Sequence, residues 1–419
     1  MSSPIVATTV PLQNAGSLAG RLVRGRPGLP FAVARDGVAW ATGKRALVGW
    51  GEFASIRPGA GDSRFTVAAR ELEEILGALR VDNRVGGPGT GPVAFGSFSF
   101  DPDCPDSSIV VPSMVLGCDG ARAWVTTIGE AADPPELPTS IERRARRTSG
   151  TLSDGEWLHA AAQARSAVTD GILDKVVLAR DAVVEGDAAF DPHLVADYLA
   201  RRYPQCFTYL FDGLVGSSPE LLVRRRGMSV ASVVLGGSAA RGATQRDDNE
   251  LAQGLLASAK DRIEHDLAVA TVRDALQGVC ESLSIENEPS LLRLPYVQHL
   301  STRASGRLAR SRDSVELAGV LHPTAAVCGV PVDKALAAIR ELEGMDRGRY
   351  CGPVGWTDAS GDGEWAIALR CAQLQGARAR IFAGAGIVAD SDPTAELAET
   401  ELKLRPLLEA LGAAPVDLD

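Results

Sequence analysis

Lysine is scarce in this chain. Only five of the 43 basic residues are lysine, and all the others are arginine; the five are Lys44, Lys175, Lys260, Lys334 and Lys403. A buried lysine can lose its proton, whereas arginine stays charged in proteins. Each lysine in this arginine-rich chain is therefore a candidate for a role that arginine cannot fill.

Histidine and cysteine are also sparse, and neither is spaced for metal or redox chemistry. The five histidines form no HExxH motif and no paired zinc spacing, and the GxSxG motif of serine hydrolases is missing. The seven cysteines contain no CxxC pair, which favours free thiols in a reducing compartment. These gaps exclude a zinc hydrolase, a serine hydrolase and a disulfide-stapled secreted domain.

Long apolar runs and excess positive charge are missing too. No run approaches the ~18 apolar residues that cross a membrane, and acidic residues exceed basic ones by 53 to 43, which gives a net charge of −10. We therefore expect neither a membrane nor a nucleic acid as partner. No basic residue precedes Arg21, unlike in a signal peptide. We expect a cytoplasmic protein and, because no obvious amphipathic interface stands out, a monomer.

The pattern of apolar residues changes along the chain. Residues 1–135 contain short apolar runs between Gly, Pro and Asp, which predicts a strand-rich N-terminal subdomain with one helix at about 66–79. Residues 136–153 are polar and rich in Pro and Arg, and we predict a linker there. From 154 to 412, strands and amphipathic helices come in groups, which indicates a layered α+β catalytic region.

Acidic residues form one candidate site. A helix predicted over about 393–411 places Glu396, Glu399 and Lys403 on one face. From spacing alone, this face is as compatible with a solvated surface that carries a Glu399–Lys403 ion pair, worth ~0.3–0.5 kcal/mol, as with a functional site. Glu264 lies in a second, highly charged helix, and this setting alone predicts a surface residue. Together, the three glutamates suit Mg²⁺, which prefers oxygen ligands.

Three further residues stand out by their apolar surroundings. Arg370 falls in a strand predicted over 363–375, where an arginine must be paired or must bind a carboxylate. Lys175 opens an apolar strand, and burial favours the neutral form of a lysine, so Lys175 is a candidate base. Glu220 follows Pro219 between apolar segments, in a strand predicted over 214–226. Burial there would keep Glu220 protonated as an acid.

Segments around these residues resemble the chorismate-utilising enzymes, a family that includes isochorismate, salicylate, anthranilate and aminodeoxychorismate synthases. The resemblance covers about residues 150–412 and rests on ordered motifs: KVVLAR (175–180), SPELLVR (218–224), GGSAARG (236–242), SAKDRIEH (258–265), QHLSTRASG (298–306), LHPTAAVCG (321–329), RGRYCGPVGW (347–356), GEWAIALRC (363–371), AGAGIV (383–388) and AELAETELK (395–403). It implies a chorismate-binding α+β fold like that of anthranilate synthase component I, with large antiparallel sheets, outer helices and a central cleft.

The resemblance also implies roles for individual residues. Lys175 matches the base that activates water for attack at C2, and Glu220 matches the acid that protonates the departing C4 hydroxyl. Mg²⁺, which holds the ring carboxylate of chorismate, is implied at Glu264, Glu396 and Glu399. Further substrate contacts are implied at Gly237, Ser238, His299, Val327, Tyr350, Arg370, Gly384 and Lys403, of which Tyr350 and Arg370 clamp the pyruvyl carboxylate.

Several positions distinguish the members of this family. Lys175 favours water as the nucleophile, because the matching position in anthranilate synthase resembles a glutamine site, where ammonia attacks and no water is activated. Gly236 stands where aminodeoxychorismate synthase commonly carries a covalent lysine, and we expect this glycine to loosen the pocket loop. The motif at 363–365 and the small Val327 resemble isochorismate synthase, whereas salicylate synthases tend to carry threonine near Ser238 and Val327.

We therefore predict an isochorismate synthase, an isomerase that serves menaquinone or siderophore biosynthesis, and salicylate synthase remains the alternative. A chorismate-binding module without catalysis is disfavoured, because it would be expected to lack Lys175 or Glu220.

Overall fold

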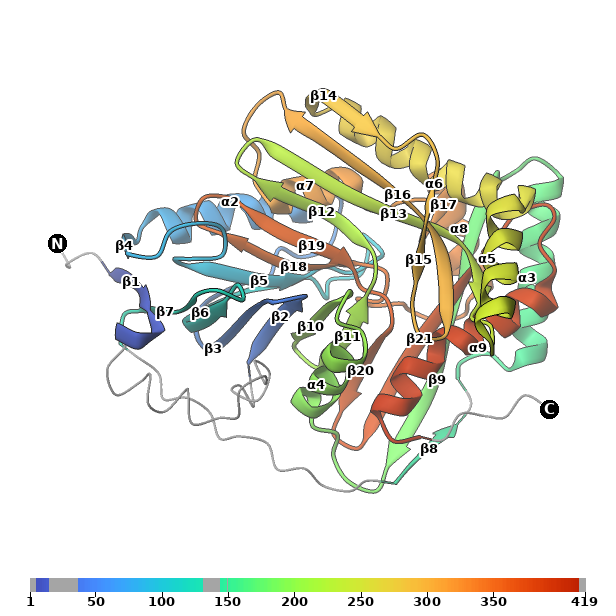
Figure 1. The fold of residues 1–419 in the computed structure, drawn as a ribbon, viewed down its shortest axis with the longest axis horizontal. Helices are drawn as coiled ribbons and strands as arrows, with labels where there is room; N and C mark the ends of the chain where they lie inside the picture. The colour runs from blue at the N-terminus through green and yellow to red at the C-terminus, as the bar shows by residue number, and fades with distance from the viewer. Residues whose placement is uncertain (1–4, 15–36, 131–143, 149, 414–419) are drawn as a thin grey trace.

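The computed structural model describes residues 5–14, 37–130, 144–148 and 150–413. Within them, strands hydrogen-bond into one branched sheet system, and helices pack on the outside (Figure 1). Every pairing between named strands is antiparallel except the one between β1 and β4. The predicted α+β class with large antiparallel sheets is therefore found. Among the described residues, no helix is long and apolar enough to span a membrane.

The sheet branches at β6, which carries β3 along one edge and β5 and β7 along the other. From β7 the sheet continues through β1 to β4. The strands of this N-terminal part are β1 (Val6–Pro11), β2 (Val38–Thr42), β3 (Arg45–Ile56), β4 (Arg80–Asn83), β5 (Val93–Ser97), β6 (Ser108–Cys118) and β7 (Ala123–Ile128). A short 3-10 helix, η1, spans Leu12–Asn14.

Two arms leave this branch point. The first arm runs from β3 through β2 and consists of β10 (Phe207–Phe211), β11 (Leu214–Ser218), β20 (Cys371–Gln375), β21 (Arg378–Ile387) and β9 (Lys175–Gly186), with β8 (Ala145–Thr148) and β17 (Gly329–Val330) beyond. The second arm runs from β5 and consists of β18 (Pro353–Asp358), β19 (Gly363–Ile367), β12 (Leu221–Arg226), β13 (Ser229–Ala240) and β16 (Val297–Leu308), with β14 (Cys280–Ile285) and β15 (Ser290–Arg293) beyond.

Helices cover both arms. They are α2 (Arg64–Gly77), α3 (Asp154–Thr169), α4 (Pro192–Arg202), α5 (Gln245–Ala257), α6 (Ala259–Gln277), α7 (Ser314–Leu321), α8 (Val332–Leu342) and α9 (Pro393–Ala410). Helix α9 packs on β21 of the first arm, and α6 packs on β13 of the second. These two helices carry the three glutamates that the sequence nominates for a metal.

Local sequence explains where the key helices begin. Ser153 caps α3 through a capping box with Glu156, as expected from its position. Ser258 separates α5 from α6 and accepts a hydrogen bond from the backbone amide of Asp261, which begins α6 as a separate helix. Asp392 caps α9, where Pro393 occupies the first turn and needs no amide hydrogen.

Two strands predicted as continuous are each broken in the middle, and both predictions are wrong for the same reason. The chain leaves β11 of the first arm, passes Pro219 and Glu220, and enters β12 of the second arm. It leaves β19 of the second arm, passes Arg370, and enters β20 of the first. Because β11 pairs with β20 and β12 with β19, the two crossings lie side by side. The structure thus places Glu220 and Arg370 where the arms meet.

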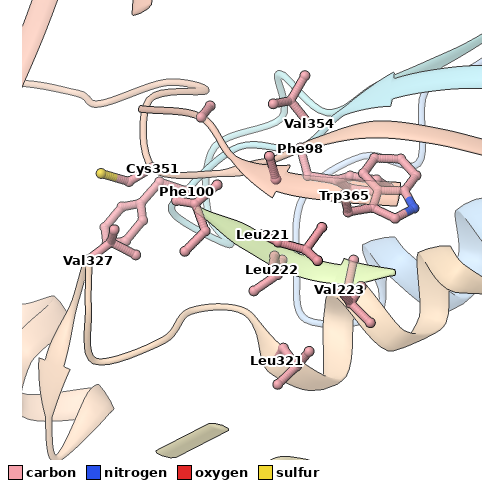
Figure 2. Packing of buried hydrophobic residues seen from close by; sticks show 14 of the residues in the cluster. Phe98, Phe100, Leu221, Leu222, Val223, Leu321, Val327, Cys351, Val354 and Trp365 are labelled. Carbon is pink, nitrogen blue, oxygen red and sulfur yellow. The ribbon is translucent and has the colours of Figure 1, made fainter. Parts of the chain in front are cut away.

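A large apolar cluster lies beside this crossing (Figure 2). Trp365 lies at one end of the group shown, and its ring centroid is 5.6 Å from that of Phe98. Val327 and Cys351 lie at the other end, and both also line the cavity described below. Since the cavity wall is the edge of a packed core, its shape is held by that packing.

The N-terminal region contributes strands to both arms. Strand β2 pairs with β10, and β5 pairs with β18, so the described strands before residue 135 share one hydrogen-bonded sheet with the rest. Residues 145–148 of the predicted linker form β8, which pairs with β9, whereas residues 136–143 and 149 lie outside the described part. The division into a subdomain at 1–135, a linker at 136–153 and a catalytic region at 154–412 stays a prediction.

Candidate active site

A cavity lies between the two arms, and most of the residues nominated from the sequence line it. It is bounded by β9 and β21 of the first arm, by β13 and β16 of the second, and by α6 and α9. The nominated residues on its wall are Glu220, Gly237, Ser238, Glu264, His299, Val327, Tyr350, Arg370, Gly384 and Lys403. Lys175, Glu396 and Glu399 do not line the wall. Lys175 contacts the wall residue Glu264, and the two glutamates lie on the same face of α9 as the wall residue Lys403.

Arg370 is a buried guanidinium that faces the cavity, and no carboxylate among the described residues pairs with it. Its backbone has a φ of 49°, a left-handed conformation that costs a non-glycine residue of order 1–3 kcal/mol. One of its terminal nitrogens, Nη2, donates to Nε2 of His299 at 3.0 Å, while the other, Nη1, is buried and finds no hydrogen-bond partner within the described part of the chain. Burial lowers the pKa of Arg370 from its usual value. The arrangement favours an anion in the cavity, which would satisfy the unused nitrogen.

His299 orients this guanidinium, and its own tautomer follows from the contacts. Because Nε2 accepts from Arg370, the ring proton lies on Nδ1, which is 3.2 Å from the carbonyl of Gly237 and 3.0 Å from the hydroxyl of Ser238. Burial and the nearby charge of Arg370 lower the pKa of His299 to about 3. His299 is therefore a neutral ring that positions Arg370.

Gly237 shapes the loop that brings Ser238 to His299. It forms a bulge in β13 with a φ of 64°, and a Cβ atom there would lie 2.8 Å from Cβ of Asp261. Such a bulge redirects the following side chain. Gly236, expected to loosen this loop, instead lies within the β13 ladder opposite Leu300 and lets His265 on α6 approach closely.

Replacing Arg370 tests its role as a carboxylate ligand. We expect Arg370→Gln to raise the KM for the substrate roughly 10- to 100-fold, because a hydrogen bond to a charged group is worth about 1.5–3 kcal/mol. Arg225→Gln is a matched control: this arginine is also buried, but it is ion-paired with Asp362 and donates to Ser360 and Ser311, away from the cavity. Steady-state kinetics measure both. An unchanged KM in folded Arg370→Gln would contradict the assignment.

Tyr350 forms the wall next to Arg370. Its ring stacks on Phe382, with centroids 5.0 Å apart and planes 9° apart, so Phe382 is a wall residue that the sequence analysis did not nominate. Gly384 admits the tyrosine, because a Cβ atom at this position would lie 3.2 Å from the Tyr350 hydroxyl. Burial raises the pKa of Tyr350 well above its usual value, so the phenol stays a neutral hydrogen-bond donor.

Glu220 is the buried acid of the cavity. The backbone amide of Leu235 donates to one carboxyl oxygen at 3.2 Å. Burial raises the pKa of Glu220 to about 7, and this effect outweighs the opposing influence of that hydrogen bond and of Lys175. A carboxyl group that holds its proton near neutral pH can act as a general acid.

Lys175 lies at the start of β9 with its side chain fully buried. Its Nζ is 3.2 Å from Oε1 of Glu264 and 3.3 Å from the carbonyl oxygen of the same residue. Gly386 makes room for this pair, because a Cβ atom there would lie 2.1 Å from Glu264 Oε1 and 3.2 Å from Lys175 Cε. Gly386 lies in the motif AGAGIV. Like Phe382, it is a site residue that the sequence analysis did not nominate.

The three glutamates nominated for a metal lie near one another, and each is paired with a lysine. Glu264 contacts Lys175, Glu396 contacts Lys260, and Glu399 contacts Lys403. Burial and the neighbouring Glu399 raise the pKa of Glu396 to about 7. Burial opposes ionisation of Glu399, but the Lys403 ion pair outweighs it and lowers the pKa of Glu399.

The chemistry of this donor set fits Mg²⁺, which takes carboxylate oxygens and retains waters. The negative charge of Glu264 also contributes to the raised pKa of Glu396, after burial and Glu399. In the described part of the chain, no three acidic, histidine or cysteine side chains converge closely enough to hold an ion as they stand. Lys260, which the sequence analysis had counted but not placed, is a member of this cluster.

Comparisons with known proteins agree with this geometry. A family model described as chorismate binding enzyme matches residues 130–412. The chain belongs to the chorismate-binding enzymes. A relative named MenF in Mycobacterium tuberculosis is 40% identical over 365 residues, which cover 83% of this chain and 94% of the relative. The salicylate biosynthesis isochorismate synthase of Pseudomonas aeruginosa is 36% identical over 416 residues, covering 89% and 84%.

Solved structures share the same fold. The menaquinone-specific isochorismate synthase MenF of Escherichia coli superposes with a TM-score of 0.78 at 24% identity and covers 97% of this chain and 94% of that chain. Anthranilate synthase component I of Streptococcus pneumoniae superposes with a TM-score of 0.71 at 21% identity, covering 86% and 91%. The predicted family and its predicted fold are therefore confirmed. The roles of individual chorismate-site residues stay predictions.

Proposed function

We propose that this protein is an isochorismate synthase that converts chorismate to isochorismate. The observation that carries the proposal is a cavity lined by a buried acid, Glu220, and by a guanidinium, Arg370, that has no carboxylate partner among the described residues. A buried lysine, Lys175, contacts the wall residue Glu264. Glu220 and Lys175 supply an acid and a base, and Arg370 suits a carboxylate such as those of chorismate. The relatives named isochorismate synthases support the same activity.

The proposed reaction balances one water added against one water lost. Lys175 takes a proton from the attacking water, whose oxygen bonds to ring carbon C2. The ring double bonds shift, and the C4 hydroxyl leaves as water with the proton that Glu220 donates. Arg370 and Tyr350 bind the pyruvyl carboxylate, and the neutral His299 keeps Arg370 in place. Lys175 and Glu220 then return to their starting protonation states by exchange with water.

Mg²⁺ would be held by Glu264, Glu396 and Glu399, where it would neutralise and orient the ring carboxylate. Lys403 lies next to this site and donates to the carbonyl of Gly384 at 2.8 Å. Gly384 and Lys403 thus link the wall beneath the substrate to the metal-binding helix α9. This link supports a binding role for both residues.

We further propose that the reaction stops at isochorismate. Pyruvate elimination, which a salicylate synthase adds, requires the side chain of the substrate to lie over the ring in a particular pose. Val327 helps to set that pose, and its carbonyl is held by Arg347 at 2.8 Å, while the same guanidinium binds the carbonyl of Val177 at 2.8 Å. A wall fixed in this way, with Val327 and Ser238 in place of threonine, favours the isomerase.

The product would supply menaquinone or siderophore biosynthesis. A solved neighbour is named as menaquinone-specific, and one relative is named as vibriobactin-specific. The chemistry at the site is the same for both. A cytoplasmic location and a monomeric state accompany this proposal as predictions.

Product analysis tests the proposed function. We expect chorismate and Mg²⁺ to yield isochorismate near neutral pH, with salicylate a minor product at most, as separated by chromatography and read by salicylate fluorescence. Excess EDTA should abolish turnover, and Mg²⁺ should restore it. Stoichiometric salicylate and pyruvate would favour the alternative, a salicylate synthase. Full activity in EDTA would contradict the metal requirement.

A further inference from the structure

Three of the five lysines in the chain are ion-paired with the three glutamates of the proposed metal site. Lys175 pairs with Glu264, Lys260 with Glu396, and Lys403 with Glu399. Each glutamate therefore has one lysine partner. Mg²⁺ needs the same carboxylate oxygens, so the lysines and the ion compete for them.

The three lysines differ in how firmly they are held. Lys175 is fully buried and also bonds the carbonyl of Glu264, while Lys403 also bonds the carbonyl of Gly384. Within the described part of the chain, Lys260 hydrogen-bonds and ion-pairs with Glu396 alone, and 26% of its side chain is exposed. Its flexible four-carbon stem can therefore carry the ammonium group into water. Among the three, Lys260 is the lysine that can break its ion pair and turn to solvent.

Glu396 cannot follow Lys260 into solvent, because only 3% of its side chain is exposed. A buried carboxylate that loses its partner is strongly destabilised unless another cation replaces that partner. An ion arriving between α6 and α9 would be such a cation, since Lys260 lies in the first turn of α6 and Glu396 in the first turn of α9.

We infer that Lys260 is a built-in competitor of the metal: its ammonium group holds Glu396 until Mg²⁺ takes that carboxylate, and Lys260 then turns to solvent. The inference rests on the proposed function, because it concerns the metal which that function requires. Its consequence is that the Lys260–Glu396 pair weakens metal binding and keeps the site folded when Mg²⁺ is scarce.

Calorimetric titration of the full-length protein with Mg²⁺ after chelation tests this competition. We expect Lys260→Met to bind Mg²⁺ at least about tenfold more tightly than wild type, a difference of about 1.4 kcal/mol. Lys44→Met removes an exposed lysine in the N-terminal region and should bind Mg²⁺ like wild type. An affinity in Lys260→Met that is equal to or weaker than that of wild type would overturn the inference.

Amine labelling of the wild-type protein provides a second test, which needs no variant to fold. An acylating reagent reports each lysine separately by mass spectrometry, because the chain has only five. Saturating Mg²⁺ should raise the labelling of Lys260 several-fold and leave the exposed Lys44 and Lys334 unchanged. Unchanged or reduced labelling of Lys260 with Mg²⁺ would overturn the inference.

The outcome is distinguishable from failure of the proposed function. Conversion of chorismate with Mg²⁺ is scored on the wild-type enzyme, independently of Lys260. If wild type makes isochorismate but Lys260→Met shows no gain in Mg²⁺ affinity, only the competition is wrong. If wild type makes no isochorismate but Lys260→Met gains Mg²⁺ affinity, only the proposed reaction is wrong.

Discussion

Replacing Lys175 by arginine should lower the turnover of chorismate by about 10²- to 10⁴-fold, the usual contribution of a general base. Arginine keeps a positive charge and could still reach Glu264, but it cannot give up its proton to accept one from water. Lys175→Ala should fall by a similar factor. Steady-state kinetics under saturating chorismate and Mg²⁺ measure the change, and substrate affinity should persist because Arg370 and Tyr350 are intact.

The matched control for this substitution is Lys334→Arg, at an exposed position on α8. It makes the same chemical change in the same chain and should leave turnover within about twofold of wild type, as expected of a surface change. A near-wild-type rate in Lys175→Arg would remove Lys175 from the role of base. The cavity would then need another group to activate water.

Glu220→Gln should also lower turnover by about 10²- to 10⁴-fold, because glutamine has no acidic proton for the departing hydroxyl. Since burial raises the pKa of Glu220 to about 7, the protonated acid is lost as the pH rises through that value. We therefore expect wild-type turnover to decline above about pH 7 and the residual rate of Glu220→Gln to lack this decline. A pH profile of both enzymes measures the effect.

Asp313→Asn is the matched control for Glu220→Gln. Burial raises the pKa of Asp313 to about 7 as well, but this carboxyl caps α7 away from the cavity, and asparagine is also a good cap. Asp313→Asn should retain turnover and the alkaline decline.

Glu220→Gln should be no less stable than wild type at pH 8, because it spares the fold a buried carboxylate charge. An alkaline decline that persists unchanged in Glu220→Gln would contradict its assignment as the acid.

Much of the fold was predictable because local signals agree with the final structure. The helix predicted over about 393–411 is found as α9 (Pro393–Ala410), since Asp392 caps it and the buried Leu404, Leu407 and Leu408 follow at helical spacing. The breaks at Glu220 and Arg370 were not predictable. Each lies within a run that reads as one strand, and the break arises because the chain moves from one arm of the sheet to the other, which is a property of the tertiary arrangement.

The candidate site was predictable where a residue type needs a special explanation, such as an arginine in an apolar run. Phe382 could not be distinguished from an ordinary core residue, because its role depends on stacking with Tyr350. Lys260 was marked by the scarcity of lysine but not assigned, since its partner Glu396 is 136 positions away in the chain. Long-range ion pairs of this kind leave no pattern in a single sequence.

Isotope labelling tests the central claim most directly. Isochorismate formed from unlabelled chorismate in water enriched in oxygen-18 should carry one labelled oxygen, at the C2 hydroxyl, because water attacks C2 and the original C4 hydroxyl departs. Mass spectrometry of the product measures the label. Isochorismate with no oxygen-18 would show that the hydroxyl migrates within the substrate, and it would contradict the assignment of Lys175 as the base that activates water.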